Sequence, residues 1–147
     1  MSEQVTFART PVWFRAVIGL GILWNVFGVY QFATQTFADE TMLLNGGMTA
    51  AQAALYAGLP VWMPIAFGVG TIGGLIGTLL LLAGRQSATP VLGLSLAGYI
   101  VLYIGDMTEG VFAAFGTPQV VILSSVVAIA VGLFMLARVA ARRGWLK

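Results

Sequence analysis

Two carboxylates near the end of a long apolar stretch are the residues best placed to do chemistry. Asp106 and Glu109 are three residues apart, so on a helix they share a face. Acidic side chains inside membrane spans are uncommon and often functional, and two neighbouring carboxylates resist carrying charge together, which suits coupling to protons. Two interpretations stay open, a buried proton or ligand site and a wet pair at the lipid headgroups. Asp106 lies about 24 Å along an ideal helix from Pro90, a depth that favours the wet pair.

Aromatic and amide side chains could complete a ligand site with this pair. Asn25 follows Trp24 in the first apolar run, and a side-chain amide in hydrocarbon needs a hydrogen-bonding partner. Asn25 either contacts a ligand or joins two helices, and we favour the joining role. The candidate ligand or proton site consists of Trp24, Asn25, Tyr99, Tyr103, Asp106 and Glu109.

The residue types that are missing exclude several classes of function. The 147-residue chain contains no cysteine and no histidine. Disulfides, thiol nucleophiles, imidazole acid–base catalysis and the usual zinc and haem ligands are therefore ruled out. The net charge of +2 gives no electrostatic footprint for nucleic acid. We expect no catalytic residues, no metal site and no cofactor, and hence a protein that is not an enzyme.

The composition indicates that these residues belong to a membrane protein. Hydrophobic residues make up 59% of the chain and charged residues 8%, against about 25% charged in soluble domains. Four apolar runs can cross a bilayer, which takes about 20 helical residues. They cover residues 12–34, 60–84, 90–112 and 118–138. The third run reaches full length only by continuing through Asp106 and Glu109 to Phe112.

These runs predict a single all-α domain, residues 1–147, built as an integral membrane four-helix bundle. Prolines, which suit the first turn of a helix, stand near all four starts: Pro11, Pro60, Pro90 and Pro118. The first run is longer than the roughly 7–15 apolar residues of a signal-peptide core. We therefore expect it to remain as an uncleaved, membrane-spanning helix.

The charges predict the orientation of the bundle. The basic residues lie in the N-terminal arm, the short 85–89 turn and the C-terminal tail: Arg9, Arg15, Arg85, Arg138, Arg142, Arg143 and Lys147. The other two connections contain carboxylates instead. Because basic loops stay in the cytoplasm, both termini are predicted to be cytoplasmic.

The one long connection, residues 35–59, is predicted to contain a short helix at the outer membrane interface. Thr49 and Gln52 are spaced as a capping box, in which each side chain bonds the backbone N–H of the other residue. The helix should cover residues 50–57 and end at Gly58, two residues before Pro60.

Small residues four apart mark the second run as a packing surface. Gly70, Gly73, Gly74 and Gly77 form two overlapping GxxxG motifs, which allow helices to approach closely in lipid. The motif does not identify the partner helix. We favour packing within one chain over a dimer seam.

Short motifs along nearly the whole chain resemble one family. They are Leu23-Trp24-Asn25-x-x-Gly28, Ala54-Leu55-Tyr56-Ala57 before Pro60-Val61-Trp62, Gly73-Gly74-x-x-Gly77, Leu94-Ser95-Leu96 and Ala141-Arg142-Arg143-Gly144-Trp145-Leu146. The chain resembles small bacterial four-helix membrane proteins that are often described as sugar transporters. The resemblance implies a small-solute, sugar-like transporter in the bacterial inner membrane.

An alternative function is a non-catalytic accessory or assembly subunit of a larger membrane complex. The small size, the glycine-rich faces and the lack of catalytic residue types favour it without further assumptions. A transporter this small would need a homo-oligomer to enclose a hydrophilic path. The expected partners are thus the lipid bilayer and either a second copy or a larger complex.

Overall fold

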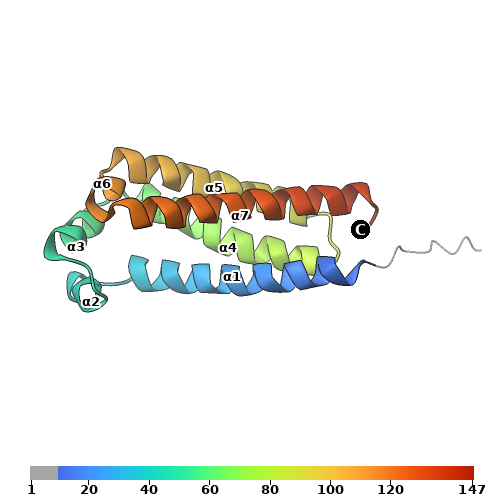
Figure 1. Ribbon diagram of the computed structural model, residues 1–147, viewed down its shortest axis with the longest axis horizontal. Coiled ribbons are helices and arrows are strands. Elements are labelled where there is room, and N and C mark those ends of the chain that lie inside the picture. Colours follow the sequence, from blue (N-terminus) through green and yellow to red (C-terminus); the bar gives the residue numbers. More distant parts are fainter. Residues whose placement is uncertain (1–9) are drawn as a thin grey trace, which may run out of the picture.

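The computed structural model describes residues 10–147, and this part of the chain is built from helices without a strand (Figure 1). In chain order the helices are α1 (Val12–Thr36), α2 (Glu40–Asn45), α3 (Ala50–Ala57), α4 (Trp62–Leu82), α5 (Ala88–Thr108), α6 (Val111–Phe115) and α7 (Thr117–Arg142). The predicted all-α class is confirmed for the described residues.

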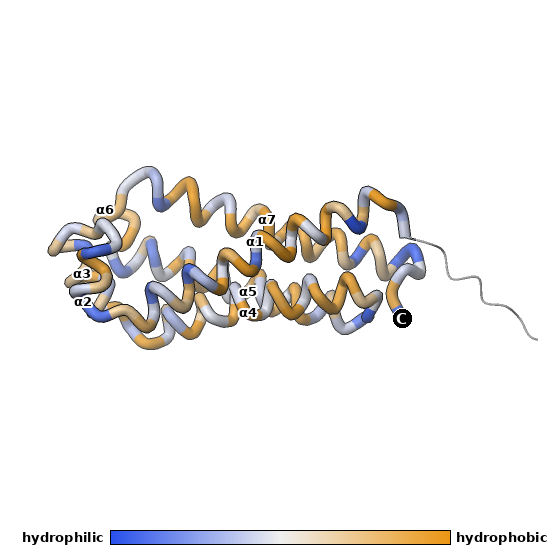
Figure 2. The backbone as a smooth tube through the Cα atoms, turned by 90° about the horizontal axis from the view of Figure 1, so that it is seen from below, coloured by the Kyte–Doolittle hydropathy of each residue, from blue (hydrophilic) through white to orange (hydrophobic). Residues whose placement is uncertain are grey.

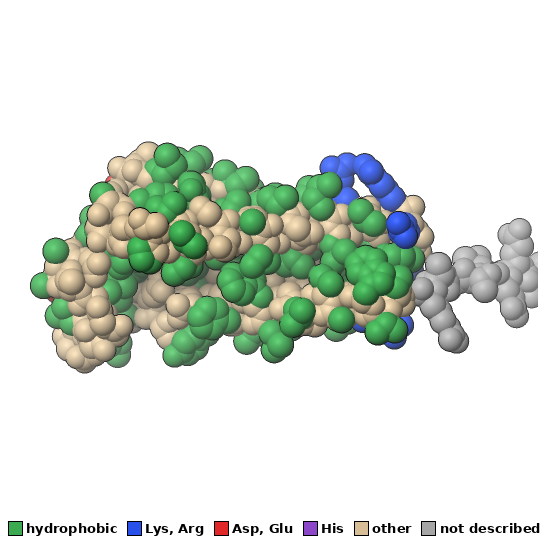
Figure 3. Space-filling view, viewed as in Figure 1, with side chains coloured by type: hydrophobic (Ala, Val, Ile, Leu, Met, Phe, Trp, Pro, Cys, Tyr) green, Lys and Arg blue, Asp and Glu red, His purple; other side chains and the backbone are tan. Residues whose placement is uncertain are grey.

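The helices α1, α4, α5 and α7 are each long and apolar enough to cross a membrane. They correspond to the four predicted apolar runs. Large hydrophobic side chains are exposed along their outer surfaces, and in Figure 3 they are spread over the length of the molecule among the tan backbone and other side chains. In Figure 2 the strongly hydrophilic positions lie mainly in the half that carries α2, α3 and α6 and at the opposite end. Such a surface is compatible with a lipid environment.

The predicted continuation of the third span through Glu109 to Phe112 is wrong. The helix α5 begins at Ala88 and ends at Thr108, and Glu109 is its C-terminal cap. Gly110 then takes a φ of 81°, a left-handed conformation that a side chain would oppose and that stops the helix. The chain then turns into α6, a separate short helix, so Glu109 caps α5 and the helix does not continue beyond it.

The helix α4 lies at the centre of the packing, against α1 on one side and α5 on the other, and α5 in turn packs on α7. A Cβ added at Gly70 would meet the ring of Tyr99 at 2.7 Å, and one at Gly77 would meet Leu92 at the same distance. Gly74 lies against Asn25 of α1. The GxxxG glycines are therefore used for close contacts within this chain.

The three short helices gather at one end of the molecule, which we call the capped end (Figure 1). The predicted capping box is confirmed: Thr49 Oγ1 accepts from the N–H of Gln52 at 3.2 Å, and Gln52 Oε1 accepts from the N–H of Thr49 at 3.0 Å. The helix α2 was not predicted. It starts where Asp39 Oδ1 accepts a hydrogen bond of 2.8 Å from the N–H of Met42.

The opposite end, which we call the arginine end, contains the start of α1, the turn between α4 and α5 and the end of α7. Its basic residues in the described part are Arg15, Arg85, Arg138, Arg142, Arg143 and Lys147, and several are visible in blue in Figure 3. Arg9 lies outside the described residues. The C-terminal tail folds back over this end: the N–H of Lys147 donates to Gly84 O at 2.7 Å, and the Trp145 ring lies 5.0 Å from that of Phe14.

Two hydrophobic cores divide the length of the molecule. At the arginine end, Phe14 and Ile18 of α1 pack with residues of the other three long helices, including Leu81, Leu92 and Leu133. Toward the capped end, the second core draws its buried members in the described chain from α4 to α7, and its centre includes Tyr99 and Leu102. We call the half at the arginine end the closed half and the half toward the capped end the open half. The helix α1 contributes buried core residues only to the closed half.

Candidate functional site

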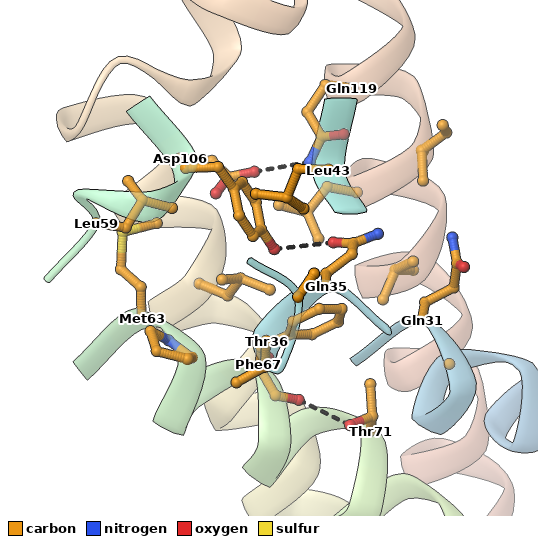
Figure 4. A pocket seen from close by; sticks show the side chains of 18 of the residues that line it. Gln31, Gln35, Thr36, Leu43, Leu59, Met63, Phe67, Thr71, Asp106 and Gln119 are labelled. Atoms are coloured by element: carbon orange, nitrogen blue, oxygen red, sulfur yellow. Dashed lines mark hydrogen bonds between the residues drawn. The ribbon is translucent and has the colours of Figure 1, made fainter. Parts of the chain in front are cut away.

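A cavity of about 500 Å³ occupies the open half, between α1 and α7. The helices α4 and α5 form its floor, and α2 and α3 cover its outer end, where the buried Leu43 of α2 points in (Figure 4). Phe27 of α1 and Ile122 of α7 line the cavity while remaining 54% and 57% exposed. These two side chains therefore mark the rim of an opening on the flank of the molecule.

Each long helix presents one face to the cavity, because its lining residues recur at intervals of three and four. On α1 they are Trp24, Gly28, Gln31 and Gln35, on α5 Tyr99, Leu102 and Asp106, and on α7 Gln119, Ile122, Leu123 and Val126. The stretch from Trp24 to Gln35 corresponds to about 17 Å along the helix axis. The cavity is therefore deep as well as wide, and it runs from the capped end toward the middle of the molecule.

Asp106 is the most deeply enclosed carboxylate of the cavity lining. Its side chain is 4% exposed, so the wet headgroup placement is wrong for this residue. Gln119 Nε2 of α7 donates a hydrogen bond of 3.0 Å to Asp106 Oδ2, as Figure 4 shows. The second carboxylate oxygen has no hydrogen-bond partner among the described residues. Because a buried carboxylate is costly unless its oxygens are satisfied, this oxygen is available to whatever enters the cavity.

Tyr56 closes the cavity from the side of α3. Its O–H donates to Gln35 Oε1 at 2.8 Å and thereby ties α3 to the end of α1 (Figure 4). Burial and, to a smaller extent, the negative charge of Asp106 raise the pKa of Tyr56 to about 12. The phenol therefore stays neutral at ordinary pH and keeps its hydrogen available for donation.

Three of the six candidate residues meet in this cavity: Trp24, Tyr99 and Asp106. Asn25 does not line it. Its Nδ2 donates to Gly21 O at 2.8 Å and to Thr78 Oγ1 at 3.3 Å, so the amide joins α1 to α4. This contact is the helix-joining role that its position in hydrocarbon favoured.

Tyr103 and Glu109 also lie apart from the cavity lining. The hydroxyl of Tyr103 shares a hydrogen bond of 3.1 Å with Ser124 Oγ of α7, and its ring packs against Phe112 at 5.0 Å. Glu109 is the C-terminal cap of α5 and is not among the lining residues. Of the proposed carboxylate pair, only Asp106 lines the cavity.

Sequence reasoning missed the amide side chains that line the polar end, Gln31, Gln35 and Gln119. A signal for two of them was present. Gln31 and Gln35 follow Trp24 and Gly28 at intervals of three and four, which puts all four residues on one face of a helix. Gln119 stands at the start of α7, where a polar residue is easily taken for a helix end.

The lining has a consistent chemical character. Carboxylates and amides gather toward the capped end, where Asp39 and Glu40 of the α2 segment join Asp106 in the lining, and none of the described lining residues is Lys or Arg. Deeper in, the lining is aromatic and aliphatic. No group of acidic residues in the described part of the chain is arranged to hold a metal ion. The lining therefore combines hydrogen-bonding groups near the cap with a mostly apolar inner part.

Comparison of the chain with protein-family models, with curated proteins and with solved structures finds no match in any of the three.

Proposed function

We propose that this chain is a polytopic membrane protein that admits a small solute into the cavity from the outer side and carries it across the membrane. The observation that supports the proposal most is a buried carboxylate, Asp106, facing a cavity of about 500 Å³ inside a molecule whose flanks are apolar. Cavities of roughly 300–1,000 Å³ are typical of small-molecule sites. An ionisable residue at membrane depth is a functional site by default.

The orientation follows from the distribution of charge. The described basic residues gather at the arginine end, while Asp39 and Glu40 lie at the capped end. With basic segments held in the cytoplasm, both termini are cytoplasmic and the cavity opens away from the cytoplasm. The bacterial inner membrane is the location that the family resemblance implies.

Carrying a solute across requires the closed half to open. Its core is held by Phe14, Ile18 and Leu133, and Gly21 brings α1 close to α7, since a Cβ at that position would lie 3.1 Å from Leu133 Cδ2. Gly21 lies between the two halves, and its contact with α7 is the point about which α1 would pivot. Rocking of α1 against α7 about this point would close the cavity outside and expose it inside, as alternating access demands.

The accessory-subunit alternative retains one supporting observation. The glycine faces of α4 are used inside the chain, but α7 is the least buried of the four long helices and keeps an apolar outer face for lipid or for a partner. A non-catalytic subunit would need no ligand in the cavity. Solute flux therefore separates the two functions.

Uptake into proteoliposomes tests the proposal, with radiolabelled glucose and radiolabelled benzyltrimethylammonium as probes. Gly28→Leu places a side chain in the cavity, whereas Gly19→Leu on the same helix meets nothing within 4 Å and serves as its control. We expect uptake of at least one probe by the wild type and by Gly19→Leu, and loss of that uptake in Gly28→Leu. Failure of both probes to enter, together with co-purification in a large complex, would overturn transport in favour of the accessory role.

A further inference from the structure

We infer that the ligand of this cavity is an amphipathic organic cation that enters sideways from the membrane, between α1 and α7. The inference rests on the proposed function and names its substrate class. It departs from the sugar-like solute that the family resemblance implies. Three observations carry it: the side opening, the gradient of polarity along the cavity and the sign of its charge.

The opening faces the surface that lipid would cover. Phe27 and Ile122 line the cavity and are more than half exposed, and both lie in helices long and apolar enough to cross a membrane. The helix α1 packs chiefly on α4, and the buried core of the open half comes from α4 to α7. A molecule dissolved in the bilayer therefore reaches the cavity without passing through the cap.

Polarity changes along the depth of the cavity. Near the capped end the lining presents Gln35, Asp106 and Gln119, while Trp24 and Val126 at the deep end are apolar apart from the indole N–H. An amphiphile in a membrane leaflet is arranged in the same sense, with its polar head at the surface and its apolar part inside. A sugar, with hydroxyls on all sides, would leave many of them unpaired against the deep wall.

The charges around the polar end select a positive head group. Asp39, Glu40 and Asp106 line the cavity, and none of the described lining residues is basic. One oxygen of Asp106 is not used by Gln119. Trp24 and Tyr99 supply aromatic surface deeper in the cavity, where the apolar part of the ligand would lie. An anionic amphiphile of the same shape would meet three carboxylates and no basic side chain among the described lining residues.

Binding of two probes with matched shape and opposite charge tests the inference. Purified protein in nanodiscs of phosphatidylcholine, which carries no net charge, is dialysed against tetraphenylphosphonium or tetraphenylborate, and binding to empty nanodiscs is subtracted. We expect saturable binding of the phosphonium and none of the borate. Asp106→Asn should weaken the affinity for the phosphonium by roughly ten-fold or more, because it removes the buried negative charge that pairs with the cation. Glu109→Gln should leave the affinity unchanged, since Glu109 does not line the cavity.

Each other outcome contradicts the inference in a recognisable way. Equal binding of both ions, or an unchanged affinity in Asp106→Asn, would show that charge does not select the ligand. Saturable binding of glucose without binding of the phosphonium would overturn the inference that the ligand is a cation, but it would leave the proposed transport function standing. Absence of binding by glucose and by both ions would remove both proposals. Circular dichroism and gel filtration establish that Asp106→Asn is folded, and Gly28→Leu supplies a second variant that blocks the cavity through its volume rather than its charge.

Discussion

The closed and open halves are made from the same four apolar helices, yet only one of them is packed shut. In the closed half, Ala137 and Ala140 of α7 are 0% exposed and belong to the core that residues of all four long helices share. In the open half, the equivalent stretch of α7 presents Ile122 and Gln119 to a cavity, and α1 presents Gln31. Apolar composition makes a helix able to enter the membrane, but residue size at each turn decides whether two helices meet.

The cap accounts for the remaining difference between the halves. Leu43 of α2 is buried at the outer end of the cavity, and Tyr56 of α3 is hydrogen-bonded to Gln35. Gln52 Nε2 of α3 donates to Ala114 O at the end of α6, next to α7. The cap is thus attached to both sides of the opening and holds α1 and α7 apart at the capped end. The arginine end instead has a tail that draws the helices together.

The comparison is sharpened most by two phenylalanines of α1. Phe14 is 2% exposed in the closed half and Phe27 is 54% exposed at the rim of the cavity. We expect Phe14→Ala to lower the free energy of unfolding by about 3–5 kcal/mol, because it leaves a hole in a packed core. Phe27→Ala should cost less than about 1 kcal/mol. Reversible unfolding in mixed micelles measures both, and similar losses would mean that the two halves are packed alike.

Removal of the C-terminal tail should have the next largest effect. A chain that ends at Gly144 loses the buried Leu146, the contact between Trp145 and Phe14, and two backbone hydrogen bonds between Lys147 and the turn that holds Gly84. We expect a loss of about 2–4 kcal/mol in the free energy of unfolding, mainly from buried apolar surface.

The matched control for the tail is Val12→Ala, at the same end of the molecule but with an exposed side chain. It should cost less than about 1 kcal/mol. If the truncated chain were as stable as the wild type, the tail would not hold the closed half together. The same mixed-micelle measurement decides this.

Two glycines of α1 give a smaller and more local contrast. A Cβ at Gly21 would lie 3.1 Å from Leu133 Cδ2, whereas a Cβ at Gly28 would have ordinary contacts of 3.4 Å or more with Thr71. Gly21→Ala should destabilise by about 1 kcal/mol as α1 is pushed from α7. Gly28→Ala should be neutral, or more stable by up to about 1 kcal/mol, since alanine favours the helix. If Gly28→Ala destabilised the protein more than Gly21→Ala, the tight contact of α1 would lie in the open half.

The titration of Tyr56 is the smallest effect. Because burial and the charge of Asp106 raise its pKa to about 12, the folded state keeps the phenol proton between about pH 10 and 12 while the unfolded state loses it. Its contribution to stability is therefore complete below about pH 10 and is lost as the pH rises through 12. The difference in phenolate absorbance between the wild type and Tyr56→Phe should show a midpoint near pH 12. A midpoint near pH 10 would place Tyr56 in open water.

Patterns in the sequence predict the helices better than the spaces between them. The four apolar runs, the Thr49–Gln52 capping box and the close approach at the α4 glycines all follow from local spacing and residue size. The end of α5 was missed because the left-handed turn at Gly110 depends on the path of the whole connection. A run of apolar residues does not reveal such a turn.

The cavity could be predicted only in part. Spacing puts Trp24, Gly28, Gln31 and Gln35 on one face of α1, but it cannot show whether a neighbouring helix covers that face. Asp106 was identified from its residue type, whereas its burial depends on Gln119, which is 13 positions away. Contacts between helices determine which residues line the cavity, and the spacing of residues within one helix does not predict those contacts.

Accessibility of single cysteines tests the division into two halves most directly, because the chain has no cysteine of its own. Gln31→Cys places a thiol in the cavity and Ala137→Cys places one in the closed core, where the native side chain is 0% exposed. In proteoliposomes, a membrane-permeant maleimide, which can enter from the bilayer through the side opening, should label position 31 and leave position 137 unlabelled. Labelling of position 137, or protection of position 31 without any ligand, would contradict an open outer half above a closed inner one.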